Sequence, residues 1–161
     1  MCAIIDAANV GNELWDPKGN DAGRGFRKAV DAGRIPLVGG GSKLMGEFTG
    51  SGQRMMNWFA ELRRSGKLTL YDNDDVDART GELKARPPNV DDGCTSDDHH
   101  IVALAQLSGA RLLYTNDQRL TRDFGNNQLI DAPRGKIYST RVTDDFSPAR
   151  KRLLARTDLC R

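Results

Sequence analysis

The stretch TSDDHHIVALAQLSGARLLYTND, residues 95–117, contains the clearest helix of the chain and a strand directly after it. Apolar residues such as Ile101 and Leu104 recur at helical spacing, and Gly109 is a typical stop signal for a helix. The apolar run 110–115 then predicts a strand. A helix that leads directly into a strand is typical of a parallel α/β sheet.

The same alternation of strands and helices continues on both sides of this unit. Apolar runs predict further strands at residues 2–5, 35–38, 67–71 and 136–140. Amphipathic or capped stretches predict helices at residues 26–32, from Ser42 onward, and at 53–64, 117–124 and 147–156. We therefore expect an α/β fold, a three-layer α/β/α sandwich with a central, mostly parallel sheet of about five strands.

Residues 1–142 are expected to form one domain, followed by a basic C-terminal helix or tail at 143–161. Inside the domain, the polar stretch 73–93 contains two adjacent prolines and few apolar residues, which predicts a long loop or insertion. Acidic residues gather in and around this stretch, and basic residues gather near the C-terminal end. Charge is therefore segregated along the chain.

The composition is that of a folded protein outside the membrane. The chain has 161 residues, of which 38% are hydrophobic and 29% charged, with a formal net charge of +2. No apolar run approaches the ~20 residues that cross a bilayer, and the start lacks the features of a secretory signal. Cys2, Cys94 and Cys160 are widely spaced and form no paired motif. We therefore expect neither a disulfide framework nor a zinc cluster, and a cytoplasmic location.

Acidic residues follow the predicted strands, at the edge where open parallel sheets bind ligands. Asp6 ends the first strand and Asp117 follows the fourth. Asp98, or its neighbour Asp97, lies in the first turn of the helix before the fourth strand, and Glu47 lies in the helix after the second. Clustered carboxylates stay ionised together only when a cation or bound protons offset their charge. Oxygen ligands favour Mg²⁺ or Mn²⁺, and two such ions can hydrolyse a phosphodiester through an activated water.

Each acid also has an explanation that needs no ligand. Asp98 follows Thr95 in a capping pattern, and Asp117 precedes a short helix as an ordinary N-cap. Glu47, taken singly, is typical of a solvated helical residue. Asp6 differs, because an acid at the end of a buried strand costs desolvation.

Four segments of the chain resemble, in order, the acidic motifs of PIN-domain nucleases. They are IIDAANV (4–10), SKLMGEF (42–48), DHHIVALA (98–105) and YTNDQRL (114–120), and the resemblance spans about residues 3–124. It implies a small α/β/α sandwich with the activity of a Mg²⁺- or Mn²⁺-dependent endoribonuclease. VapC-type toxins of toxin–antitoxin pairs are among the members of this family.

The resemblance also implies roles for the residues at the matching positions. The acids implied to be catalytic and to bind the metal are Asp6, Glu47, Asp98 and Asp117. The residues implied to support the same pocket are Asn9, Asp97, Thr115, Asn116 and Asp123.

Basic residues near this edge and in the C-terminal helix are candidates for binding the phosphates of a nucleic acid. They are Lys43, Arg54, Arg119, Arg150, Lys151 and Arg152. For the C-terminal group, the alternative is a solvated helix face.

His99 and His100 lie near Cys94 but lack the spacing of zinc ligands. Adjacent histidines on a helix point in different directions. We expect one of them to pack between sheet and helix and the other to face solvent.

The sequence therefore predicts a cytoplasmic, metal-dependent hydrolase that cleaves RNA in preference to DNA. The alternative is a module of the same fold that binds RNA or a partner without turnover and uses its acids as helix caps. A toxin held silent by an antitoxin shares the chemistry and differs in its partner. The apolar stretch 55–59 would be core on one side and a homodimer patch on the other.

Overall fold

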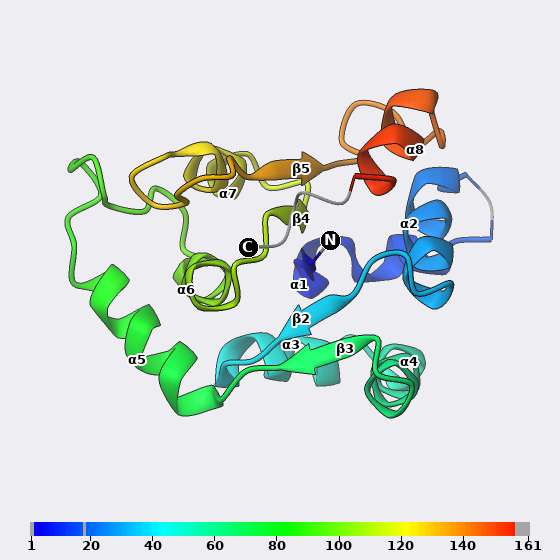
Figure 1. The fold of residues 1–161 in the computed structure, drawn as a ribbon, viewed down its shortest axis with the longest axis horizontal. Helices are drawn as coiled ribbons and strands as arrows, with labels where there is room; N and C mark the ends of the chain where they lie inside the picture. The colour runs from blue at the N-terminus through cyan, green and yellow to red at the C-terminus, as the bar shows by residue number, and fades with distance from the viewer. Residues whose placement is uncertain (1, 18, 157–161) are drawn as a thin grey trace.

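A computed structural model describes residues 2–17 and 19–156. Five short strands form one parallel sheet in the order β3-β2-β1-β4-β5 (Figure 1). They are β1 (Ala3–Ile5), β2 (Leu37–Gly39), β3 (Leu68–Leu70), β4 (Leu112–Tyr114) and β5 (Lys136–Tyr138). Because β1 lies between β2 and β4, the residue that follows β1 reaches the middle of the sheet edge.

Helices cover both faces of this sheet. They are α1 (Ala7–Val10), the 3-10 helix η1 (Gly11–Leu14), α2 (Asp21–Asp31), α3 (Ser42–Gly50), α4 (Gln53–Arg64), α5 (Asn73–Lys84), α6 (His99–Ser108), α7 (Gln118–Gly125) and α8 (Pro148–Leu154). Figure 1 places α5, α6 and α7 on one side of the strands and α2, α4 and α8 on the other. The predicted three-layer α/β/α sandwich with a parallel sheet of five strands is confirmed.

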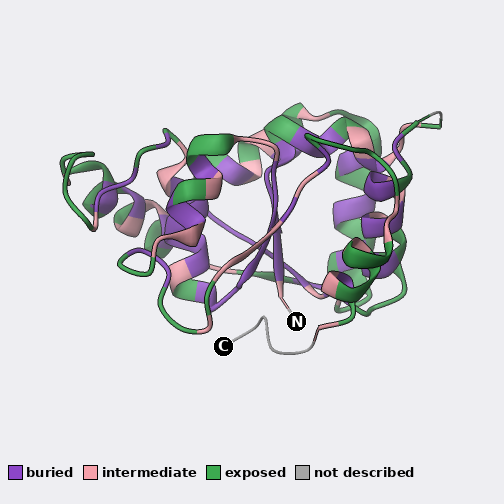
Figure 2. Ribbon diagram, turned by 90° about the horizontal axis from the view of Figure 1, so that it is seen from above, coloured by how far each residue is buried: buried purple, intermediate pink, exposed green. Residues whose placement is uncertain are grey.

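The core lies around the central strands. Every residue of β1 and β4 is buried, as expected of parallel strands covered by helices on both faces (Figure 2). Phe26 of α2 packs against Tyr114 and Tyr138, with ring centroids 4.9 and 5.1 Å apart. The Tyr138 hydroxyl donates to the Ala22 carbonyl at 2.7 Å. These contacts fix β4, β5 and α2 to one another and make the strand ends a firm platform.

The prediction of a long polar loop is wrong over its first half, because Asn73–Lys84 form helix α5. The Asp72 carboxylate caps this helix by accepting two backbone N–H groups of its first turn. Val76, Thr80 and Leu83 recur at helical spacing and are buried, and α5 packs against α6. A helix that buries only one narrow stripe needs few apolar residues, so the polar composition concealed it.

Helix α5 also caps α3. Ser42, from which the sequence predicted this helix, is the first residue of α3, and Gly41 takes the N-cap position with φ 84°. The side chains of Asn73 and Asp77 accept the backbone N–H groups of Gly41 and Ser42, both at 2.9 Å. A Cβ atom on Gly41 would lie 2.6 Å from Val76, so glycine is required for this close approach.

The predicted C-terminal helix is present as α8, while residues 157–161 of the predicted tail, including Cys160, lie outside the described residues. Cys94 is a buried free thiol. Across residues 2–17 and 19–156, no helix has the length and apolar character needed to span a membrane.

Candidate functional site

Asp6 occupies the middle of the sheet edge because it directly follows the central strand β1. Its backbone N–H donates to the Tyr114 carbonyl at 3.0 Å, which continues the pairing of β1 with β4. The Thr115 hydroxyl donates to Asp6 Oδ2 at 2.7 Å and accepts the backbone N–H of Asp117 at 3.0 Å. The ends of two neighbouring strands thus hold the Asp6 carboxyl group in place.

The Asp6 carboxyl group is a difficult place for a negative charge. Asp6 is 4% exposed, and burial raises the pKa of its carboxyl group to about 6. The hydrogen bond from Thr115 lowers this pKa, while the negative charges of Asp98 and Glu47 raise it further. A carboxylate opposed by burial and by two like charges is stabilised by a nearby cation.

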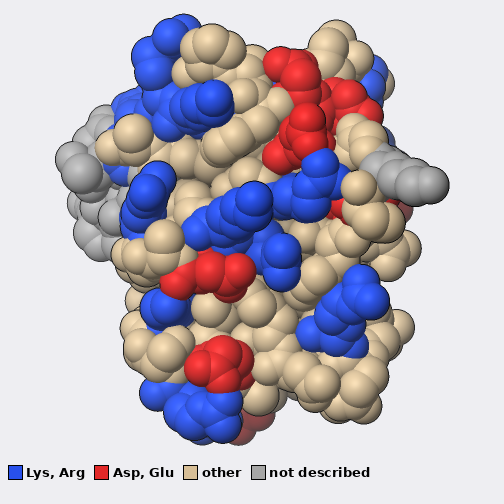
Figure 3. All heavy atoms as spheres, turned by 90° about the vertical axis from the view of Figure 1, so that its right-hand side faces the viewer, with Lys and Arg blue, Asp and Glu red and all other residues tan. Residues whose placement is uncertain are grey.

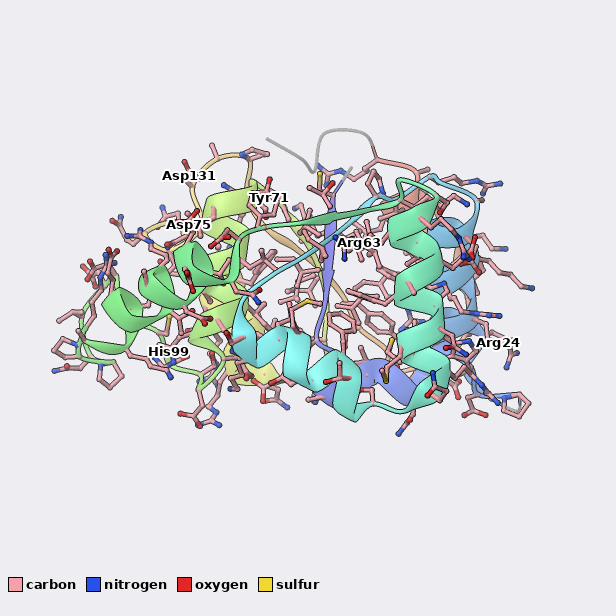
Figure 4. All side chains as sticks on the ribbon, turned by 90° about the horizontal axis from the view of Figure 1, so that it is seen from below. Arg24, Arg63, Tyr71, Asp75, His99 and Asp131 are labelled. Atoms are coloured by element: carbon pink, nitrogen blue, oxygen red, sulfur yellow. The ribbon has the colours of Figure 1, made fainter. Side chains whose placement is uncertain are left out.

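Two acids and a histidine converge near Asp6. Glu47 belongs to α3, Asp98 precedes α6 and His100 lies in the first turn of α6. One ligand atom of each lies within 4.8 Å of the others. His100 is 1% exposed, with Nε2 3.3 Å from Glu47 Oε2. In Figure 4, α3 runs beside the start of α6, where His99 is labelled. The spacing of these atoms suits ligands of one divalent ion.

Lys43 carries a positive charge to the same cluster from one turn earlier on α3. Its Nζ lies 3.6 Å from Asp98 Oδ1 and 4.0 Å from Glu47 Oε1. The lysine side chain is 48% exposed, so these ion pairs are screened by solvent and contribute little to stability. Lys43 therefore offsets part of the negative charge through a flexible, solvent-accessible ammonium.

The structure separates the neighbouring acids Asp97 and Asp98. Asp98 occupies the N-cap position of α6, but its side chain accepts no capping hydrogen bond. The side chain of Asp97 is 85% exposed and pairs with Arg119 at 3.3 Å. The capping explanation is therefore wrong for Asp98, and Asp98 is the member of the pair that joins the cluster.

Asp117 is the N-cap of a short helix, which is the explanation without a ligand that its sequence position had offered. Its Oδ1 accepts the backbone N–H of Leu120 at 2.7 Å and so caps α7. It does not belong to the ligand group described above, and the hydroxyl of Thr115 lies between it and Asp6. Two of the four predicted acids, Glu47 and Asp98, therefore join His100 in the ligand group. Asp6 lies outside this group but interacts electrostatically with both acids, and Asp117 serves as a cap.

Glu13 of η1 is a member of this region that the sequence motifs missed. It accepts hydrogen bonds from the Tyr114 hydroxyl and, at 2.9 Å, from Asn116 Nδ2. Asn9 Oδ1 accepts the backbone N–H of Asn116 at 2.8 Å. These bonds join the segment after β1 to the end of β4. The one sequence signal for Glu13 is its position: it directly precedes the apolar Leu14 in the segment after the first motif.

Asp123 of α7 positions the segment that leads to α6. It is 2% exposed and accepts the backbone N–H groups of Thr95 and Ser96, both at 2.8 Å. It also accepts the Thr95 hydroxyl at 2.7 Å, so Thr95 is not the cap of α6 that the sequence pattern had indicated. Asp123 thus anchors the chain just before Asp98 and does not belong to the ligand group.

The predicted phosphate-binding residues lie in different settings. Arg54, Lys151 and Arg152 are exposed, whereas Lys43 and Arg119 are ion-paired. Arg150 does not fit the prediction, because its side chain is 14% exposed and donates to the Ser139 carbonyl at 2.7 Å and the Thr143 hydroxyl at 3.0 Å. The Arg150 guanidinium is used to fold the segment between β5 and α8.

Comparisons of the chain with protein-family models, curated proteins and solved structures gave no match. The resemblance to PIN-domain nucleases therefore rests on the four sequence motifs. The geometry of the acid cluster is a separate observation, because it depends on which side chains the fold brings together.

Proposed function

We propose that the protein is an endoribonuclease that hydrolyses phosphodiester bonds with the help of Mn²⁺ or Mg²⁺. One observation carries the proposal: ligand atoms of Glu47, Asp98 and His100 lie within 4.8 Å of one another, near the buried Asp6. The cluster lies beyond the carboxyl end of the central strand, where open parallel sheets bind ligands. The choice of RNA as substrate comes from the motif resemblance.

The residues present fit a divalent cation. Carboxylates suit both Mg²⁺ and Mn²⁺, and the imidazole of His100 favours the transition ion Mn²⁺ over Mg²⁺. The sequence had indicated a set of oxygen ligands alone, and this histidine adds a nitrogen to it. A bound ion supplies a water of lowered pKa and a positive charge that stabilises a phosphodiester under attack.

The other residues have roles of their own in this proposal. Asp6, held by a hydrogen bond from Thr115, would present a carboxylate to the ion, whose charge offsets the burial and the like charges that raise the Asp6 pKa to about 6 in the metal-free protein. Lys43 presents an ammonium that attracts the phosphate of the substrate. Asp123 keeps Asp98 in place through the segment before α6.

The neighbouring acids offer a matched test. Asp98→Asn and Asp97→Asn make the same chemical change one residue apart, inside and outside the cluster. We expect Asp98→Asn to abolish Mn²⁺-dependent cleavage of a fluorescent RNA and Asp97→Asn to retain it. Circular dichroism checks that both variants fold. Equal cleavage by the two variants contradicts the proposal.

One observation favours the alternative of an RNA-binding or partner-binding module without turnover. The ammonium of Lys43 already lies against Asp98 and Glu47, as it would in a protein that uses these acids only for structure. Binding without cleavage in Mg²⁺ and Mn²⁺, across several RNA and DNA substrates, would support this alternative. An antitoxin partner, a homodimer and a cytoplasmic location stay predictions from the sequence.

A further inference from the structure

A groove of about 830 Å³ lies between α2 and α8, away from the acid cluster. Four basic side chains and one acidic side chain line it: Arg24, Lys28, Arg34, Lys151 and Asp21. Figure 3 shows lysine and arginine atoms gathered on this face of the molecule. In Figure 4, the label of Arg24 on α2 and that of His99 on α6 lie at opposite ends of the view. The groove and the cluster are therefore separate sites.

Within residues 2–17 and 19–156, most of the positive charge in this groove has no carboxylate partner. Arg24 pairs with Asp21, the one acid of the lining, and also donates to a backbone carbonyl. Lys28, Arg34 and Lys151 form no ion pair with any carboxylate in the described part of the chain. Like charges that converge on one hollow repel one another, and a bound anion relieves that repulsion.

An aromatic ring forms part of the wall of the groove. Phe146 packs on α2 so closely that a Cβ atom on Gly25 would lie 2.7 Å from its ring. The Lys151 ammonium lies 5.4 Å from the centroid of the same ring. Phe146 is only partly buried, so the groove combines basic groups with an accessible aromatic edge. Single-stranded nucleic acids bind to grooves with this combination, since cations contact the backbone and rings contact the bases.

We infer that this groove binds the phosphate backbone of single-stranded RNA, as a contact separate from the acid cluster. The three cations that form no ion pair among the described residues come from both walls, Lys28 from α2 and Lys151 from α8, with Arg34 after α2. A strand with a phosphate on each nucleotide can contact all three cations together. The choice of RNA among polyanions rests on the proposed function, whereas the requirement for an anion rests on the groove itself.

The test is the binding of a fluorescent oligouridylate of about twelve nucleotides to the full chain in EDTA, followed by anisotropy. For a single strand, the logarithm of the association constant falls by about 0.7 per phosphate contact for each tenfold rise in salt. Lys28→Gln/Arg34→Gln should therefore reduce the salt slope by about 1.4 and weaken binding roughly 25-fold at about 0.1 M salt. Lys151→Gln, on the other wall, should weaken it about fivefold.

The matched control is Lys84→Gln/Arg134→Gln, which removes the same charge from exposed positions outside the groove. It should bind the oligonucleotide within about twofold of the wild type at the same salt, since it removes no phosphate contact. Equal weakening by the control and the groove variants would overturn the inference, because net charge alone would then explain the binding. An unchanged affinity in the groove variants would overturn it as well.

Two further measurements distinguish RNA binding in the groove from the binding of acidic proteins and from the proposed activity. A polyglutamate peptide of similar charge should compete weakly; if it displaces the RNA completely at equal charge concentration, the groove is a site for acidic proteins and the inference is wrong. The second measurement is RNA cleavage by the wild type and the groove variants in Mn²⁺ and Mg²⁺. Groove-dependent binding with no cleavage in any metal would refute the proposed activity alone, whereas cleavage with groove-independent binding would refute this inference alone.

Discussion

Replacing Asp6 by asparagine is expected to stabilise the metal-free protein above about pH 6, relative to the wild type. Burial and two neighbouring acids raise the Asp6 pKa from 3.8 to about 6, which corresponds to about 3 kcal/mol. Below pH 3.8 the group is protonated in the folded and unfolded states, and its contribution to stability is complete. As the pH rises toward 6, the unfolded state releases the proton first, and this stability is lost.

The measurement is urea unfolding in EDTA from about pH 4 to about pH 7.5, followed by far-UV circular dichroism. Asparagine keeps the shape and an acceptor for the Thr115 hydroxyl but cannot ionise. Any cost of burying the amide is the same at every pH. The predicted quantity is therefore the gain of Asp6→Asn over the wild type, which should grow by about 2.4 kcal/mol across this range.

Asp123 provides the matched control, because it is also a buried aspartate. It accepts three hydrogen bonds from Thr95 and Ser96, and asparagine replaces one of its acceptor oxygens by a donor. Asp123→Asn should therefore destabilise the protein at neutral pH by about 1–3 kcal/mol. If the gain of Asp6→Asn does not change with pH, or if both variants destabilise the protein equally, the account of Asp6 as an acid under electrostatic stress is refuted.

Three other perturbations test the same region. Saturating Mn²⁺, at about 100 times its dissociation constant, should raise the unfolding free energy of the wild type by about 2.7 kcal/mol, and Asp98→Asn should remove most of this gain in a calorimetric scan. Lys43→Met should tighten Mn²⁺ binding several-fold in titration calorimetry, because it removes a competing ammonium 3.6 Å from Asp98; weaker binding would show that the lysine supports the site. Asp77→Ala should cost about 1 kcal/mol in urea unfolding, since it removes a cap of α3, whereas Asp75→Ala, on the exposed side of α5, should cost less.

The sheet was predictable from the sequence because each strand is a short apolar run next to glycine or polar residues. Helix α5 was not, because its sequence shows no strong amphipathic pattern and its acids resemble those of a solvated loop. Its stability depends on the Asp72 cap and on burial of Val76 and Leu83 near α6, and such tertiary contacts override local propensity.

The candidate site was predictable to the extent that it depends on the strand ends. An acid at the end of a buried strand costs desolvation free energy, and this cost identified Asp6 as a candidate functional residue. The choice between Asp97 and Asp98 needed the orientation of the first turn of α6, which spacing along the chain does not determine. His100 was not predicted as a ligand, because its spacing from Cys94 and His99 does not suit zinc. Its proximity to Glu47 arises only when α3 packs beside α6.

Polar and acidic residues of α5 cap the start of α3. A helix N-terminus carries unpaired N–H groups and a partial positive charge, which an acceptor side chain satisfies. Asn73 and Asp77 supply such acceptors to the first turn of α3, and that helix carries Lys43 and Glu47 into the cluster. A change in α5 would therefore move the cluster without touching any of its ligand atoms. On this argument α5 belongs to the scaffold of the site, and Asp72 and Asp77, two acids of this polar stretch, serve as helix caps.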